Sequence, residues 1–192
     1  MKALLFPGQG SQAIGMGLEF YKNFDTAKNI FSEADESLNF KISKIILEGP
    51  EEKLKLTQNT QPAILTVSYA IYNVLKKDFS LKLDDLKYYA GHSLGEYSAL
   101  VCSGSLKFKD ALYLLYERGK AMQEAVPVGK GAMLAILGLG TDEINNFISQ
   151  ASKEGVCEVA NDNANGQIIV SGNIESITSL QNILKENKKK SI

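Results

Sequence analysis

The chain is poor in several residue types, and each scarcity excludes a class of protein. Its 192 residues include only two cysteines, Cys102 and Cys157, which provide no disulfide framework and no spacing typical of a metal site. We therefore expect no bound metal and a cytoplasmic location. A formal net charge of -1 gives no overall attraction to nucleic acid or to an anionic membrane. The longest apolar runs, such as residues 132–137, are far too short to span a bilayer.

Histidine and arginine are scarcer still. His92 is the only histidine, and Arg118 is the only arginine among the 21 lysine and arginine residues. A guanidinium group presents a planar fork of donors that fits a carboxylate, which the ammonium group of lysine cannot reproduce. Since the chain uses lysine everywhere else, the place of Arg118 in the fold is informative.

The first 127 residues alternate strands with helices, which predicts an α/β domain with a mainly parallel sheet. Short apolar runs predict strands at Lys2–Phe6 and at residues 87–90. A polar cap at Asn59, followed by Pro62, predicts the start of a helix that runs to Val74. Further helices are expected at residues 13–39, from the second strand through Leu100, and at residues 108–124.

Residues 128–192 follow a different pattern, in which a strand, a helix, two strands and a helix succeed one another. The expected strands are residues 132–137, 156–161 and 167–171, and the expected helices are Thr141–Ala151 and residues 174–187. This order is one strand short of a ferredoxin-like βαββαβ unit. A missing strand leaves an unpaired sheet edge, which native domains avoid. We therefore expect an incomplete ferredoxin-like subdomain in a chain that is truncated at its C-terminus.

The pattern Gly91-x-Ser93-x-Gly95 is that of a nucleophile elbow, and it stands between a predicted strand and a predicted helix. The tight turn strains the backbone of the serine, and the two glycines leave room for the crowding. The following helix directs the backbone N–H of Leu94 at the oxyanion that forms when Ser93 attacks a carbonyl group. Taken alone, the pattern also fits an ordinary tight turn.

Helical periodicity places Arg118 in the middle of a predicted buried stripe. Its side of the helix carries Ala111, Leu114, Leu115, Ala121 and Met122, and the opposite side carries Asp110, Tyr113, Glu117, Lys120 and Glu124. A buried guanidinium without a partner is costly, so it needs a carboxylate. That carboxylate is either an Asp or Glu of the core or the free acid of a dicarboxylic acyl group. The second interpretation has more support, because this helix closely follows the serine elbow in the sequence.

The glycine-rich turn at residues 8–13 follows the first strand and also matches the dinucleotide-binding fingerprint G-x-G-x-x-A. That fingerprint requires an acidic residue about 20 positions further on, at the end of a second strand. The acids within residues 33–36 lie in a helical pattern instead. In the other interpretation, the backbone N–H of Gln9 is a second oxyanion donor beside Ser93, because the two strands are neighbours.

Several motifs occur in a fixed order along the chain. They are Phe6-Pro7-Gly8-Gln9-Gly10-Ser11-Gln12, Thr60-Gln61-Pro62-Ala63, Gly91-His92-Ser93-Leu94-Gly95-Glu96-Tyr97 and Arg118-Gly119-Lys120-Ala121-Met122. Together they resemble the malonyl-CoA:acyl-carrier-protein transacylases and the related acyltransferase domains of polyketide and fatty-acid synthases. Residues 161–172 resemble the small subdomain of that family, so the resemblance covers the whole chain.

The resemblance implies an α/β-hydrolase-like core with an inserted ferredoxin-like subdomain, and a ping-pong reaction without a cofactor. Ser93 attacks malonyl-CoA, CoA leaves, and the phosphopantetheine thiol of acyl-carrier protein takes the malonyl group for fatty-acid biosynthesis. The resemblance makes Gln9 and Leu94 the oxyanion donors and Arg118 the residue that binds the malonyl carboxylate. It also implies lesser contributions to the site from the Gln9 side chain and from Asn163.

The catalytic base is where the chain departs from the family. The resemblance places the catalytic histidine after the small subdomain, just beyond Ile192. His92 precedes Ser93 on a sharp turn, so we expect its side chain to point away from the hydroxyl and to pack beneath the elbow. A serine without a base is a poor nucleophile. The alternatives to an enzyme are therefore a non-catalytic module that binds acyl groups or CoA, and a dinucleotide-binding domain.

Overall fold

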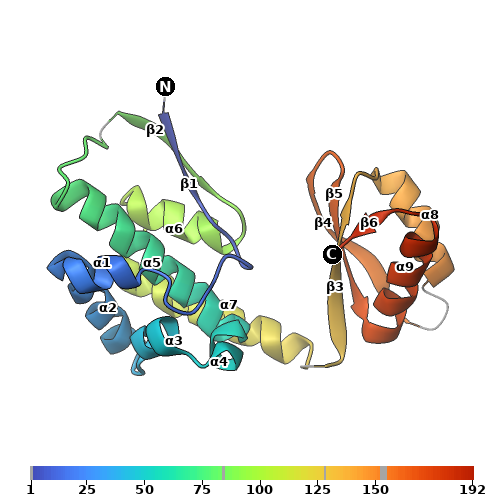
Figure 1. Cartoon of the computed structure of the whole chain (residues 1–192), viewed down its shortest axis with the longest axis horizontal. Coiled ribbons are helices and arrows are strands. Elements are labelled where there is room, and N and C mark those ends of the chain that lie inside the picture. The colour runs from blue at the N-terminus through green and yellow to red at the C-terminus, as the bar shows by residue number, and fades with distance from the viewer. Residues whose placement is uncertain (1, 84, 128, 152–154) are drawn as a thin grey trace. The chain divides into compact units, whose positions relative to one another are not determined.

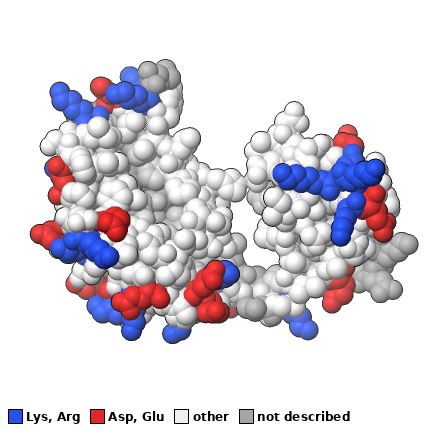
Figure 2. All heavy atoms as spheres, viewed as in Figure 1, with Lys and Arg blue, Asp and Glu red and all other residues white. Residues whose placement is uncertain are grey.

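Two units, Met1–Ala125 and Val126–Ile192, make up the chain in the computed structural model, which describes residues 2–83, 85–127, 129–151 and 155–192 (Figure 1). The division predicted from the sequence, between residues 127 and 128, lies two residues later. Within the described ranges, none of the helices combines the length and the apolar character that crossing a membrane requires. On the face shown in Figure 2, acidic and basic side chains are interspersed over the first unit.

The first unit combines a parallel pair of strands with helices (Figure 1). Its elements are β1 (Lys2–Phe6), α1 (Leu18–Asn23), α2 (Asp25–Leu38), α3 (Ile42–Glu48), α4 (Glu51–Lys55), α5 (Thr57–Lys77), β2 (Leu86–Gly91), α6 (Leu94–Cys102) and α7 (Phe108–Ala125). In the parallel register, Phe6 at the end of β1 lies opposite Gly91 at the end of β2. The loops that follow these two strands therefore start at the same edge of the sheet.

Helix α5 is the centre of the first unit, because α2, α6 and α7 all pack against it. Its residues 59–67 are all buried. The helix begins at Thr57, two residues before the predicted cap Asn59, so Pro62 lies within its second turn. The reason is that Leu56 is extended (φ -62°, ψ 126°) and its carbonyl accepts the N–H groups of Asn59 and Thr60 at 2.8 and 2.9 Å.

The single helix predicted at residues 13–39 is wrong at its start and in its middle. Gly15 and Gly17 have positive φ angles of 80° and 76°, so the chain turns there and α1 begins only at Leu18. Phe24 is extended (φ -129°, ψ 121°) and separates α1 from α2. Helix α2 buries the apolar side predicted for it, which comprises Ala27, Ile30, Phe31 and Ala34.

The second unit is a four-stranded antiparallel sheet with two helices. Its elements are β3 (Gly131–Leu137), α8 (Thr141–Ala151), β4 (Cys157–Ala164), β5 (Gln167–Asn173), α9 (Ile174–Glu186) and β6 (Lys190–Ser191). The strand order is β4-β5-β3-β6, which is that of a ferredoxin-like unit. Alternate residues of β3 and β5, including Leu134, Ile136 and Val170, form a core with α8 and α9. The parallel sheet in one unit and the antiparallel sheet in the other confirm the predicted α/β class.

The sixth strand, which the sequence predicted to be missing, is present as β6. Lys188 has a positive φ of 55° and reverses the chain after α9, where the N–H of Lys189 bonds to the carbonyl of Leu184 at 2.8 Å. Beyond β6, Ile192 and Ala135 exchange backbone hydrogen bonds of 2.9 and 2.8 Å. A run of lysines shows no apolar alternation, yet lysine is typical of strands at the edge of a sheet.

Each unit contains one buried cysteine, which supplies a test of its packing. Cys102 is 5% exposed and Cys157 is 3% exposed. Burial raises the pKa of the Cys102 thiol to about 12 and also raises the pKa of Cys157. Both thiols therefore stay protonated and unreactive near pH 8, since the thiolate is the nucleophile. We expect no reaction with Ellman's reagent before unfolding in urea, and a Cys102→Ser variant then reports on the second unit alone. A rapid native reaction at either thiol would contradict this packing.

Candidate active site

Ser93 lies in the turn between β2 and α6, the strand–turn–helix context that the elbow motif requires. Its backbone angles are φ 55° and ψ -116°, outside the regions that residues other than glycine normally adopt. Such strain occurs at functional sites, where the surrounding structure holds the residue in place. The side chain is exposed. The turn therefore presents the Ser93 hydroxyl to the outside of the unit.

Both glycines of the elbow are necessary, because neither position has room for a Cβ atom. A Cβ atom at Gly91 would lie 2.1 Å from the carbonyl carbon and oxygen of Gly95. A Cβ atom at Gly95 would lie 2.6 Å from the carbonyl oxygen of Phe6 and 2.9 Å from that of Pro7. No real side chain tolerates such distances. The elbow is thereby folded closely on itself and held against the end of β1.

The sequence predicted two backbone amides beside this hydroxyl, those of Leu94 and Gln9. Leu94 is the first residue of α6, at the positive end of the helix. The next two N–H groups are occupied, since Gly95 donates to the carbonyl of His92 at 2.9 Å and Glu96 donates to that of Ser93 at 3.1 Å. The arrangement leaves the N–H of Leu94 for an acceptor beside Ser93.

The second amide, that of Gln9, belongs to the loop after β1. Gln9 is exposed and follows Gly8, where a Cβ atom would lie only 3.1 Å from the carbonyl oxygen of His92. The glycine turn therefore touches the residue that precedes Ser93. The parallel pairing of β1 with β2 brings these two loops together, as the sequence predicted.

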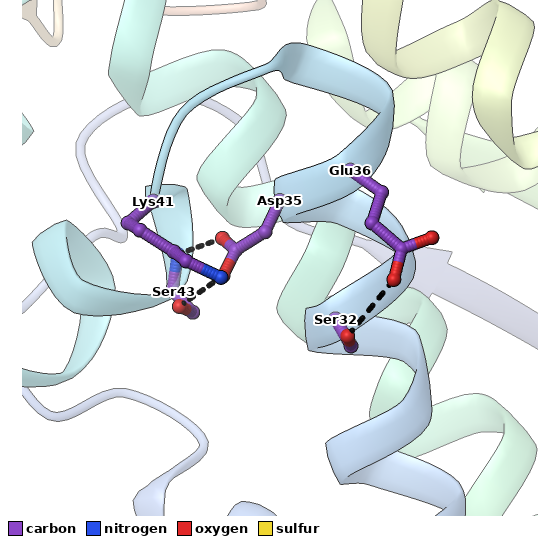
Figure 3. Close-up of polar contacts among 5 residues, drawn as sticks. All are labelled: Ser32, Asp35, Glu36, Lys41 and Ser43. Carbon is purple, nitrogen blue, oxygen red and sulfur yellow. Dashed lines mark hydrogen bonds and ion pairs between the residues drawn. The ribbon is translucent and has the colours of Figure 1, made fainter.

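The structure contradicts the dinucleotide-binding alternative for this turn. That fingerprint requires the glycines to open a helix directly, whereas residues 11–17 form no helix and α1 begins at Leu18. The carboxylate of Asp35 also already has hydrogen-bond partners within the protein. It is 7% exposed and accepts the backbone N–H and the hydroxyl of Ser43 at 2.8 and 2.7 Å, and Lys41 lies 3.3 Å away (Figure 3). Asp35 thus caps the start of α3.

Arg118 extends from α7 to the elbow. Its Nη2 donates a hydrogen bond of 3.1 Å to Oγ of Ser93, so the structure joins the two side chains that the sequence singled out. Its Nη1 donates a bond of 2.7 Å to Oε1 of Gln61, a neutral acceptor. Among the described residues, no carboxylate oxygen lies within 4.0 Å of the guanidinium. Of the two interpretations of the sequence, the ion pair with an Asp or Glu of the core is therefore not found among the described residues.

The buried stripe predicted around Arg118 is only partly correct. Ala111 and Leu115 are fully buried, but Leu114 is 45% and Met122 is 47% exposed, and Arg118 itself is half-buried. The two helices run antiparallel, because Phe108 at the start of α7 stacks on Tyr69 of α5 and Gly119 lies against the first turn of α5. Most residues of α7 beyond that point are exposed, although Met122 still accepts a hydrogen bond from Gln61 of α5. The opposite side of α7 is exposed as predicted, at Asp110, Tyr113, Glu117, Lys120 and Glu124.

Gln61 is a site residue to which the sequence assigned no role. Its side chain is fully buried in the second turn of α5, and its Nε2 donates to Sδ of Met122 at 3.4 Å. This second bond orients the amide so that Oε1 faces Arg118. The available signal was a polar residue within an otherwise buried helix, since buried polar groups need partners.

Two other predictions have different outcomes. His92 is exposed, so it does not pack beneath the elbow as expected. Its carbonyl oxygen accepts the N–H of Gly95 at 2.9 Å, and both that oxygen and Nδ1 of its ring lie beside Gly8, 3.1 and 3.6 Å from the position of a Cβ atom there. Asn163 lies in β4 of the second unit and is exposed. Its role at the site stays a prediction.

Comparison with known proteins agrees with this geometry. The model of the acyl transferase domain family matches residues 3–191. The chain belongs to this family. It is 48% identical over 191 residues to a malonyl CoA-acyl carrier protein transacylase of Bacillus subtilis. That alignment covers 96% of this chain and 57% of the relative, so the chain spans little more than half the length of that acyltransferase.

Solved structures of acyltransferases give the same fold. A crystal structure of an acyl-carrier-protein-S-malonyltransferase from Bartonella henselae is 41% identical with a TM-score of 0.89, and the match covers 100% of this chain and 62% of that one. A malonyl-transacylase solved in complex with a type II polyketide acyl-carrier protein is 39% identical with a TM-score of 0.87. The latter match covers 98% of this chain and 60% of that structure.

Gly119 provides a test of how α7 is placed. A Cβ atom there would lie 2.5 Å from Cα of Gln58 and 2.6 Å from the carbonyl oxygen of Thr57. We expect Gly119→Ala to push α7 away from α5 and to lower the free energy of unfolding by about 1–3 kcal/mol, as overpacking does. Chemical denaturation measures this change. Gly140→Ala is the control, because nothing lies within 4 Å of a Cβ atom there. Equal stability of the two variants would contradict the close contact.

Proposed function

We propose that this chain carries the nucleophile and the acyl-binding groups of a malonyl-CoA:acyl-carrier-protein transacylase, which acts in the cytoplasm in fatty-acid biosynthesis. The observation that carries the proposal is the 3.1 Å contact between Nη2 of Arg118 and Oγ of Ser93. It places a fixed positive charge beside a serine on a strained elbow. The names of the relatives, which include a transacylase in complex with a carrier protein, support the same substrates.

In the first half of the proposed reaction, Oγ of Ser93 attacks the thioester carbonyl of malonyl-CoA. The negative charge that develops on the carbonyl oxygen is stabilised by the N–H groups of Leu94 and Gln9, two donors that need no reorganisation. The C–S bond then breaks, CoA leaves as its thiol, and an acyl-serine ester remains. In the second half, the phosphopantetheine thiol of acyl-carrier protein attacks this ester and restores Ser93. No step requires a cofactor.

The proton of Ser93 must pass to a base and return to the leaving thiol. His92 precedes the serine on the elbow, and its backbone is committed to the turn. The family resemblance assigns this role to a histidine that follows the small subdomain. Asn163 of the second unit is proposed as a lesser contributor near the site.

Arg118 accounts for the choice of a malonyl group. In malonate, two C–C bonds of about 1.5 Å at an angle of about 111° separate the two carboxyl carbons by only about 2.5 Å. A group that holds the free carboxylate must therefore stand next to the atom that attacks the thioester. The guanidinium does so, because it already contacts Oγ of Ser93. Its planar fork of donors suits a carboxylate.

The direct test is covalent labelling. When the gene product that carries this chain is incubated with malonyl-CoA, we expect one malonyl group on the peptide that contains Ser93, detected by mass spectrometry after proteolysis. Ser93→Ala should remove the label, because no other hydroxyl lies on the elbow. Binding of malonyl-CoA without any acyl-serine would contradict the proposal and favour the non-catalytic binding module.

A second test concerns Arg118. We expect Arg118→Ala to lower kcat/KM for malonyl-CoA by about 100-fold, since hydrogen bonds to charged groups contribute about 1.5–3 kcal/mol. Slow transfer from acetyl-CoA, which has no free acid, should not fall. Lys120→Ala is the matched control, because Lys120 is an exposed cation on the outer side of the same helix. An equal loss with both substrates would argue against recognition of the carboxylate.

A further inference from the structure

The environment of Gln61 shows how Arg118 is held. Gln61 is 0% exposed and lies about one turn along α5 from the residues that α7 touches through Gly119. At Gly119, next to Arg118 in the chain, the backbone of α7 rests on the backbone of Gln58 and Thr57. This contact fixes the distance between the two helices at the level of the guanidinium. Gln61, one turn further along α5 than Thr57, then spans the gap to Arg118.

The chemical nature of the Gln61 side chain is as informative as its place. Its Oε1 accepts from Nη1 of Arg118 at 2.7 Å, a short distance typical of a hydrogen bond to an ionised donor. Glutamine and glutamate have nearly the same shape, so a carboxylate at position 61 could pair with the half-buried Arg118. Here the acceptor is an amide, and no carboxylate of the described residues lies within 4.0 Å of the guanidinium. The positive charge of Arg118 is therefore oriented without being neutralised.

The two terminal nitrogens of Arg118 have different partners, one in the protein interior and one at the elbow. Nη1 is used by Gln61, and the amide of Gln61 is itself oriented by its bond of 3.4 Å to Met122. Nη2 points to Oγ of Ser93, on the side where a substrate would bind. Fixing a long side chain before the substrate arrives removes the entropy cost of ordering it during binding.

We propose that Gln61 is a positioning residue, a neutral buried acceptor that holds Arg118 beside Ser93 while leaving its charge for the carboxylate of the acyl substrate. This inference rests on the proposed malonyl transfer. It assigns the selectivity for an acid to a pair of residues, in which Arg118 supplies the charge and Gln61 supplies its direction. Gln61 touches neither the substrate nor the reacting atoms.

The test compares Gln61→Glu, Gln61→Leu and the wild type in the gene product that carries this chain, with malonyl-CoA and acetyl-CoA as substrates. A carboxylate at position 61 would pair with Arg118 and compete with the substrate, so Gln61→Glu should raise KM for malonyl-CoA about tenfold or more with a smaller change in kcat. Gln61→Leu frees the guanidinium and should lower kcat/KM for malonyl-CoA. Transfer from acetyl-CoA should change little in either variant.

Two controls separate positioning from a general structural role. Asn73→Asp makes the same change of amide to carboxylate in α5, at a residue that is 7% exposed and lies 12 residues, or about 18 Å, further along the helix. It should leave KM for malonyl-CoA unchanged. In an Arg118→Ala background, Gln61→Leu should alter malonyl transfer by less than about twofold, because the group that it positions is gone.

The outcomes are distinct. A Gln61→Glu variant with the wild-type KM for malonyl-CoA, or additive losses in the double variant, would overturn the positioning role. Loss of acetyl transfer in parallel with malonyl transfer would show a structural role instead. Failure of the proposed function would be visible separately, since the wild type would then form no acyl-serine and Arg118→Ala would behave as the wild type.

Discussion

The reacting groups owe their positions to a constraint of space, because at Gly91, Gly95 and Gly119 the backbone of one element lies too close to another for any Cβ atom. The first two glycines hold the elbow against itself and against the end of β1. The third sets α7 on the first turn of α5. Protein interiors are packed too densely to absorb such overlaps. The contacts at Gly91 and Gly95 therefore fix the position of Ser93, and the contact at Gly119 fixes the position of Arg118.

Electrostatic and conformational costs are concentrated at the same place. Arg118 is half-buried with an amide and a hydroxyl as partners, which is a weaker compensation than a carboxylate. Ser93 has a strained backbone, which costs about 1–3 kcal/mol. The apolar core that α5 forms with α2, α6 and α7 offsets both costs. The site thus has an unsatisfied preference for an anion, and a substrate carboxylate would satisfy it.

The sequence predicted the residues that have a local signal. Ser93 stands in a recognisable motif, and Arg118 is conspicuous because it is the only arginine. Gln61 has a weaker signal, a polar residue within an otherwise buried helix, and its role depends on how α7 lies against α5. Periodicity gives the direction of a side chain around a helix but not how completely the neighbouring elements cover it, and Leu114 and Met122 are exposed in a stripe predicted to be buried. Strand β6 and the break between α1 and α2 depend on single residues that turn or extend the backbone, and periodicity does not detect those.

The nucleophile, the two proposed oxyanion donors and the guanidinium proposed to bind the acid belong to the first unit. Their geometry follows from the register of β1 with β2, the start of α6 and the contact of α5 with α7, so it does not depend on where the second unit stands. Because the guanidinium of Arg118 contacts Ser93 directly, the proposed recognition of the acid and the proposed attack on the thioester would occur within one hydrogen bond of each other. A dicarboxylic acyl group with a longer chain would bring its acid to Arg118 only by moving its thioester away from Ser93 or by folding back. In the proposed function, the contact that binds the acid therefore also limits the length of the acyl group.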